Sequence, residues 1–106
     1  MGRRIGFAVV RGRSMLPTLS DGDRLLVVHG AVPRAGRLVV VRLDDVVAVK
    51  RAVRREPAGW WVERDNPSEG VDSWSVGAVG DEQVLATVLC RVWPVFRRVS
   101  RKTHSP

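Results

Sequence analysis

A chain of 106 residues is long enough for one domain with a single hydrophobic core and too short for two. No apolar run reaches the roughly 18 residues of a membrane-spanning helix, and residues 1–10 are too short an apolar stretch for a signal peptide, so we expect a soluble cytoplasmic protein. A lone cysteine and two histidines argue against a disulfide, a metal centre or another cofactor, and the formal charge of +7 is spread over scattered arginines.

Six segments rich in Val, Leu and Trp predict β-strands, because clusters of Gly, Pro, Asp and Asn separate them. In chain order they cover residues 5–11, 24–28, 38–43, 46–54, 60–64 and 83–93. The pair Asp44-Asp45 predicts a tight hairpin turn that places the third and fourth segments side by side. Helical spacing of apolar residues is missing, so we expect at most one helical turn, at residues 16–19 after Ser14.

This pattern predicts an all-β fold, a small bent antiparallel sheet or partly open barrel, which protects its strand edges better than a flat sheet does. The folded domain is expected to cover residues 1–96. Residues 97–106 are basic and polar and bury too little apolar surface to offset the entropy of ordering them, so they predict a disordered tail.

Lysine is used sparingly, since only Lys50 and Lys102 among the 18 basic residues are lysine. A lysine gives up its proton far more readily than an arginine, so a single lysine in a predicted strand indicates a role that arginine cannot fill. Strand alternation puts Lys50 on one face with Val46, Ala48 and Ala52, and Arg51 on the other. Lowering the pKa of a lysine from about 10.4 to about 7 takes roughly 4–5 kcal/mol, which burial can supply. The alternative is an edge-strand lysine that extends its amine to water.

Ser14 directly follows the first predicted strand, where its side chain can project into a cleft. A serine hydroxyl needs a neighbouring base to act as a nucleophile at neutral pH. His29 precedes Gly30 at a predicted turn and His104 lies in the tail, so the sequence gives little support to a Ser-His-Asp triad. The alternative role for Ser14 is to cap the turn that follows it.

Three stretches carry a family resemblance. Residues 12–19 (Gly-Arg-Ser-Met-Leu-Pro-Thr-Leu) and 22–27 (Gly-Asp-Arg-Leu-Leu-Val) resemble the nucleophile box of type I signal peptidases. Residues 49–53 (Val-Lys-Arg-Ala-Val) resemble the lysine box of that family, and Asp-Asn-Pro at 65–67 with Asp72, Ser73 and Gly77 is similar to its C-terminal box. The three stretches follow the order of the family and cover most of the chain.

The resemblance implies a serine endopeptidase with a Ser-Lys dyad and a signal peptidase-like catalytic domain. Ser14 would attack the scissile carbonyl, neutral Lys50 would accept its proton, and the Ser14 N–H would help to bind the oxyanion. Met15 would pack near the dyad and contribute, with Pro17, to substrate binding. The substrate would be a protein or peptide that adds itself to a strand edge, with small side chains in shallow apolar pockets.

Asp72 and Ser73 would be supporting residues that hold the lysine strand and the loops around the site. The chain departs from the family at three nearby positions. Gly12 replaces a serine whose hydroxyl often completes the oxyanion hole, Gly70 replaces another serine near the lysine, and Trp74 replaces an arginine.

We expect no membrane anchor in this protein, unlike signal peptidases that cleave exported preproteins. Within the superfamily, Trp-Trp at 60–61, Asp-Asn-Pro at 65–67 and Val-Trp-Pro at 92–94 look most like the nickel-type superoxide dismutase maturation proteases. The implied activity is removal of an N-terminal leader from the dismutase precursor. The partner would be that precursor, with no nucleic acid, and peripheral membrane contact and oligomeric state are left open.

Four other functions compete with this interpretation. The chain could be a signal peptidase-like protease for another precursor, or a non-catalytic basic β-barrel that binds a partner. A nucleic-acid barrel usually interleaves aromatic and basic residues, whereas this chain has two Phe and no Tyr. Self-cleaving repressors of the SOS response share the Ser-Lys chemistry, but only thirteen residues precede Ser14 here, so we expect no autocleavage.

Overall fold

The computed structural model of the protein describes residues 3–99, and one antiparallel sheet forms most of that part of the chain. Its strands are β1 (Arg4–Val9), β2 (Arg24–His29), β3 (Leu38–Leu43), β4 (Val46–Glu56), β5 (Gly59–Glu63), β6 (Val84–Trp93) and β7 (Arg97–Arg98). Their order in the sheet is β1-β2-β6-β3-β4-β5, and β7 pairs with β6. The all-β prediction is confirmed, and all six predicted strands form within two residues of their expected bounds.

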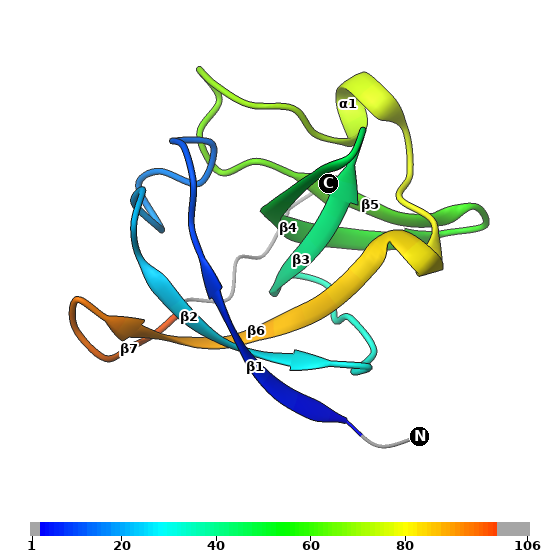
Figure 1. Ribbon diagram of the computed structural model, residues 1–106. Coiled ribbons are helices and arrows are strands. Elements are labelled where there is room, and N and C mark those ends of the chain that lie inside the picture. The colour runs from blue at the N-terminus through cyan, green and yellow to red at the C-terminus, as the bar shows by residue number, and fades with distance from the viewer. Residues whose placement is uncertain (1–2, 100–106) are drawn as a thin grey trace.

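Strand β6 joins the two parts of the sheet, because its first half pairs with β3 and its second half pairs with β2. Figure 1 shows β6 crossing the molecule between the β1–β2 pair and the β3–β4–β5 group. Register shifts interrupt the β2–β6, β3–β6 and β4–β5 ladders. Such irregularities bend a strand and increase its twist, so the sheet curls while β1 and β5 remain its two edges.

The hairpin between β3 and β4 fixes the position of Lys50. Asp44 and Asp45 have φ values of 47° and 66°, the left-handed conformation that a two-residue turn of this kind needs, so the turn prediction is confirmed. The turn sets a register in which Val39 lies opposite Lys50 and Leu38 opposite Arg51. Neighbouring residues of β4 therefore face opposite sides of the sheet.

Both faces of β3 are buried, each against a different hydrophobic cluster. Leu38 and Val40 belong to one cluster, which we call the Met15 cluster; its other members are Val10, Met15, Leu19, Leu25, Val27, Val49 and Ala86. Val39 and Val41 belong to the second, which we call the Trp60 cluster; its other members are Leu43, Ala52, Trp60, Val62 and Val79. The loop between β1 and β2 carries Ser14, and we call it the nucleophile loop after the role predicted for that serine. It is anchored in the first cluster through Met15 and Leu19, and the strand face that carries Lys50 joins the second through Ala52.

The short helical segments agree with the expectation only in part. Residues 14–18 form a turn in which the Leu19 N–H donates to Met15 O at 2.9 Å, the i→i+4 bond of the single helical turn expected after Ser14. The sequence did not predict α1 (Ser73–Val76) or the 3-10 turn Asp81–Gln83, because elements this short show no apolar period. Within the described residues, no helix is long and apolar enough to cross a membrane.

The chain continues in regular structure beyond the expected domain boundary at residue 96. Arg97 and Arg98 form β7 and pair with Arg91 and Cys90, and Val99 packs against the Met15 cluster. Pairing with β6 gives the backbone N–H and C=O groups of these residues hydrogen-bond partners, whereas the composition predicted that they would be exposed to water. The tail therefore does not begin at residue 97. Its remaining residues, 100–106, lie outside the described part, and their disorder stays a prediction.

Candidate functional site

Ser14 lies on the loop between β1 and β2, and contacts from both sides fix that loop. Met15 is 1% exposed in the core. On the other side, the Asn66 N–H donates to Ser14 O and the Asn66 side-chain amide donates to Arg13 O, both at 2.8 Å. The loop is thus held at the backbone on either side of the Ser14 side chain.

Lys50 lies on β4, and its side chain contacts Ser14: Lys50 Nζ donates to Ser14 Oγ at 3.0 Å. The lysine is 3% exposed, so the snorkelling alternative does not apply. Burial lowers the pKa of Lys50 below its ordinary value, because it disfavours the charged amine. The Asp72 carboxylate acts in the opposite direction, and the Arg64 guanidinium adds to the lowering.

Ser14 and Lys50 line a common cleft of about 300 Å³. Val46 and Ala48 share this wall with Lys50, as strand alternation predicted, whereas Ala52 packs in the Trp60 cluster. Leu43 and Val71 complete the apolar lining, and four charged residues also border the cleft: Arg11, Arg13, Asp44 and Glu69. Such a cleft suits an extended peptide with small apolar side chains.

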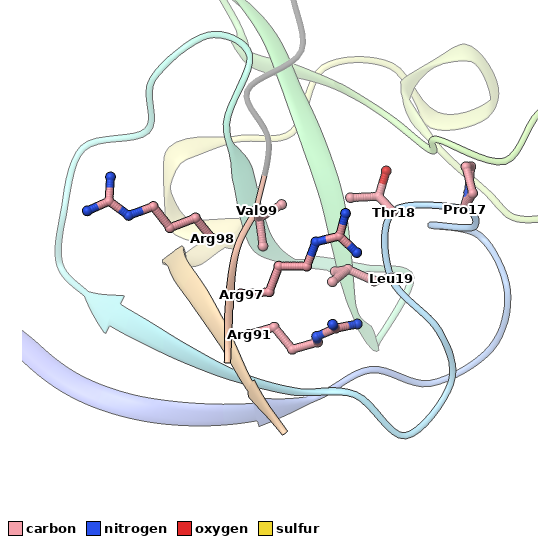
Figure 2. Close-up of a pocket in the computed structure, with 7 residues that line it drawn as sticks. All are labelled: Pro17, Thr18, Leu19, Arg91, Arg97, Arg98 and Val99. Atoms are coloured by element: carbon pink, nitrogen blue, oxygen red, sulfur yellow. The ribbon is translucent and has the colours of Figure 1, made fainter. Parts of the chain in front are cut away.

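Met15 and Pro17, the other predicted substrate-binding residues, do not line this cleft. Met15 faces the core, where its Sδ accepts a hydrogen bond from the Asp65 N–H at 3.4 Å. Pro17 lies at a separate pocket of about 320 Å³ between the nucleophile loop and β7. Figure 2 shows the lining of that pocket, where Arg91 and Arg97 extend toward Thr18 and Leu19 while Arg98 points away from them.

Asp72 and Ser73 support the strand next to the lysine strand. The Ser73 hydroxyl accepts from the Val62 N–H of β5 at 2.8 Å, and the Asp72 carboxylate accepts from the Arg64 N–H at 3.1 Å. Asp72 also caps α1 by accepting from the Trp74 N–H. These contacts hold β5 and the start of α1, and they reach β4 only through the β4–β5 ladder, so the supporting role of Asp72 and Ser73 stays a prediction.

A buried ion pair below the site was missed by sequence reasoning. Arg51 donates from Nη2 to Asp65 Oδ2 at 2.5 Å and from Nη1 to Gly36 O at 3.1 Å. The Thr18 hydroxyl donates to the same Asp65 oxygen at 2.5 Å. Asp65 therefore ties β4 to the nucleophile loop. An arginine inside an apolar strand does indicate a buried ion pair. The sequence could not identify the partner, because Asp65 lies 14 residues away.

The two glycines that replace family serines differ in their surroundings. Gly12 has a φ of +80° and open space where a side chain would project, and its N–H donates to Asp21 Oδ1 at 2.7 Å. Gly70 has a φ of +118°, and a Cβ there would lie only 2.4 Å from Ser14 Cβ. A serine at position 70 would collide with Ser14.

Within residues 3–99, histidine takes no part in the site. His29 ends β2 at the end away from the nucleophile loop, and its Nδ1 lies 3.3 Å from Leu85 O. His104 lies outside the described residues.

Comparison with known proteins gives the family. Residues 2–88 match the Peptidase S24-like family. A relative named LexA repressor from Methylococcus capsulatus (strain ATCC 33009 / NCIMB 11132 / Bath) is 44% identical over 63 residues, which are 58% of this chain and 31% of the relative. Another LexA repressor, from Ectopseudomonas mendocina (strain ymp), is 46% identical over 59 residues, 55% of this chain and 28% of the relative. The match thus spans under a third of each curated relative.

These relatives carry the repressor name, whereas the sequence motifs favoured the signal peptidase branch. The family match covers both the Ser14 loop and the Lys50 strand. The chain belongs to the Peptidase S24-like family.

Proposed function

We propose that this chain is a serine endopeptidase in which Ser14 is the nucleophile and Lys50 the general base. The observation that carries the proposal is the 3.0 Å approach of Lys50 Nζ to Ser14 Oγ inside a cleft with apolar walls. Burial supports it further, because it lowers the pKa of Lys50 and so favours the neutral amine that accepts a proton.

The reaction follows from this pair. As Ser14 Oγ bonds to the scissile carbonyl carbon, its proton passes to Lys50 Nζ, and the resulting ammonium then protonates the leaving amine when the C–N bond breaks. Water attacks the acyl-enzyme ester in the second half, again giving its proton to Lys50, and Ser14 leaves with that proton restored. Among the hydrogen bonds of residues 3–99, none uses the Ser14 N–H, which leaves it for the oxyanion.

We propose as substrate a precursor with an N-terminal leader, specifically that of nickel-type superoxide dismutase. The support is the sequence resemblance at residues 60–61, 65–67 and 92–94. The apolar lining from Leu43, Val46 and Ala48 is consistent with a leader whose residues at the cut are small. A signal peptidase-like protease for another precursor would use the same cleft.

A second candidate is cleavage of the chain's own polypeptide. The curated relatives are named LexA repressor, and the sequence resembles self-cleaving repressors in its Ser-Lys chemistry. Kinetic order separates the two candidates. Self-cleavage within one molecule is first order, so its half-life does not change with protein concentration, whereas cleavage of a separate precursor becomes faster as more enzyme is added.

The test is mass spectrometry of a nickel-dismutase precursor incubated with the purified protein. Ser14→Ala and Lys50→Arg are expected to abolish cleavage, while Ser20→Ala, a serine of the same loop, serves as the matched control. Loss of the leader with the parent and control alone supports both dyad and substrate. An intact precursor refutes the substrate, and cleavage by either dyad variant refutes the dyad. A protein that cuts neither the precursor nor itself, and binds a partner equally well as Ser14→Ala, would be a binding module.

A further inference from the structure

Arg64 makes an unusual number of contacts beside the Ser14–Lys50 cleft. It directly follows β5, and its side chain is 25% exposed. Nε donates to Asn66 O at 2.9 Å, Nη2 donates to Pro67 O at 3.1 Å, and Nη1 lies 3.3 Å from Asp72 Oδ2. Each guanidinium nitrogen therefore has its own partner, a fixed geometry that a lysine ammonium cannot reproduce.

The loop held by Arg64 is the one that presses on Ser14. Asn66, whose carbonyl accepts from Arg64, itself binds the carbonyls of Arg13 and Ser14. At Gly70 a Cβ would lie 3.2 Å from Arg64 Cδ and 2.4 Å from Ser14 Cβ. Gly70 thus lies between the aliphatic part of the Arg64 side chain and Ser14. Movement of Arg64 would release this loop from the serine.

Asp72 is the second target of Arg64, and it bears on the charge of Lys50. Its carboxylate is buried and favours the protonated lysine, whereas the Arg64 guanidinium opposes protonation. Pairing with Arg64 places a positive charge 3.3 Å from Asp72 Oδ2, which offsets part of the attraction between the Asp72 carboxylate and the Lys50 ammonium. Four other charged residues border the cleft, and being exposed they are screened by salt: Arg11, Arg13, Asp44 and Glu69, of which Arg13 and Glu69 pair with each other at 3.4 Å.

We infer that Arg64 is a positioning residue of this site: it clamps residues 66–70 against Ser14 and pairs with Asp72, the carboxylate that acts on the charge of Lys50. The sequence has Trp74 where an arginine would follow Asp-Ser, and Arg64 brings a guanidinium to Asp72 from the end of β5 instead. The inference rests on the proposed function for its catalytic meaning, but the charge of Lys50 can be measured without any substrate.

The substrate-free test uses the small number of lysines. Protein labelled with ¹³C and ¹⁵N in lysine gives side-chain NMR signals from Lys50 and Lys102 only, and Lys50→Arg assigns them. Arg64→Gln is expected to raise the pKa of Lys50 by about 1, because a nearby cation is lost and Asp72 is left unpaired. Arg54→Gln is the matched control, since Arg54 pairs with Glu56 at 2.7 Å on the same strand as Lys50. An unchanged Lys50 titration in a folded Arg64→Gln protein overturns the inference.

The activity test reads the same effect in cleavage. Because the neutral lysine is the active form, Arg64→Gln should move the rising limb of the pH profile of kcat/KM to higher pH, with about a tenfold loss at neutral pH. Arg64→Lys keeps the cation but loses the three-pronged geometry, so it should lower kcat with little change in KM or in the Lys50 pKa. If Arg64→Gln does not fold, Arg64→Lys decides the question, and a parental kcat there overturns the clamp.

The two proposals fail differently. A parent that cleaves nothing while Arg64→Gln still shifts the Lys50 titration contradicts the proposed function and leaves the arrangement of charges standing. A parent that cleaves its substrate while the Lys50 titration ignores Arg64→Gln contradicts this inference alone.

Discussion

The charge state of Lys50 couples the chemistry of the site to the stability of the fold. Burial lowers the pKa of Lys50, so the unfolded chain, with a pKa near 10.5, holds the proton more tightly than the folded protein. Between the lowered pKa and 10.5 the unfolded state binds more protons, and the free energy of unfolding therefore rises with pH.

Replacing Lys50 with methionine should remove this penalty. Lys50→Met is expected to be more stable than the parent at pH 7 and to have a higher Tm, with the difference in stability shrinking as the pH approaches 10.5. Thermal unfolding at several pH values measures it. Lys50→Arg, which stays charged throughout, should lack the rise with pH. If the difference in stability between Lys50→Met and the parent is the same at every pH, the penalty does not come from the charge of the lysine.

The absence of a side chain at Gly70 leaves room for Ser14. Gly70→Ala places a Cβ 2.4 Å from Ser14 Cβ, so we expect at least a tenfold loss of kcat/KM together with destabilisation of about 1–2 kcal/mol from the positive φ. Gly77→Ala is the matched control, because its φ is +81° and nothing lies within 4 Å of the added methyl group. It should lose similar stability and keep its activity. Equal activity losses in both variants would show that strain alone is responsible.

At the scale of elements, the Arg51–Asp65 pair joins β4 to the loop that carries the serine. Both side chains are almost fully buried, at 2% and 3% exposure. Asp65→Asn leaves the buried guanidinium without its counter-charge, and we expect a loss of about 3–5 kcal/mol in urea unfolding. Asp81→Asn, which breaks the exposed pair with Arg55, should leave stability nearly unchanged. A small effect at Asp65 would mean that the remaining polar groups compensate for the charge.

The elements that sequence could predict are those specified by neighbouring residues. Runs rich in valine predicted β3 and β4, and Asp44-Asp45 predicted the turn between them, so the face carrying Lys50 was predictable. Motif resemblance supplied Ser14 as its partner. What could not be predicted depends on distant residues, such as the partner of Arg51 and the placement of Pro17 at a different pocket from Ser14. Residue types carry little information about which loops meet in space.

At the scale of the whole molecule, β3 is the element on which both hydrophobic clusters depend. It is hydrogen-bonded to β4 on one side and to β6 on the other. Val40 faces the Met15 cluster, which holds the serine loop, and Val41 faces the Trp60 cluster next to the lysine. If the two clusters unfold as one unit, a destabilising substitution in either cluster should lower the stability of the whole domain.

Val40→Ala and Val41→Ala test this coupling as a matched pair, since they make the same change at adjacent positions on opposite faces. Each is expected to cost about 2 kcal/mol, and each should speed hydrogen exchange by a similar factor at amides in both clusters, such as Val27 and Val62. Exchange that accelerates only in the cluster that was altered would divide the domain into two units. The Ser14 loop is anchored in the Met15 cluster, whereas β4, which carries Lys50, contributes Val49 to that cluster and Ala52 to the Trp60 cluster. Independent opening of the clusters would therefore loosen the contact between Ser14 and Lys50 without unfolding the chain. We expect the shared strand to prevent this and so keep the 3.0 Å contact intact until the whole domain unfolds.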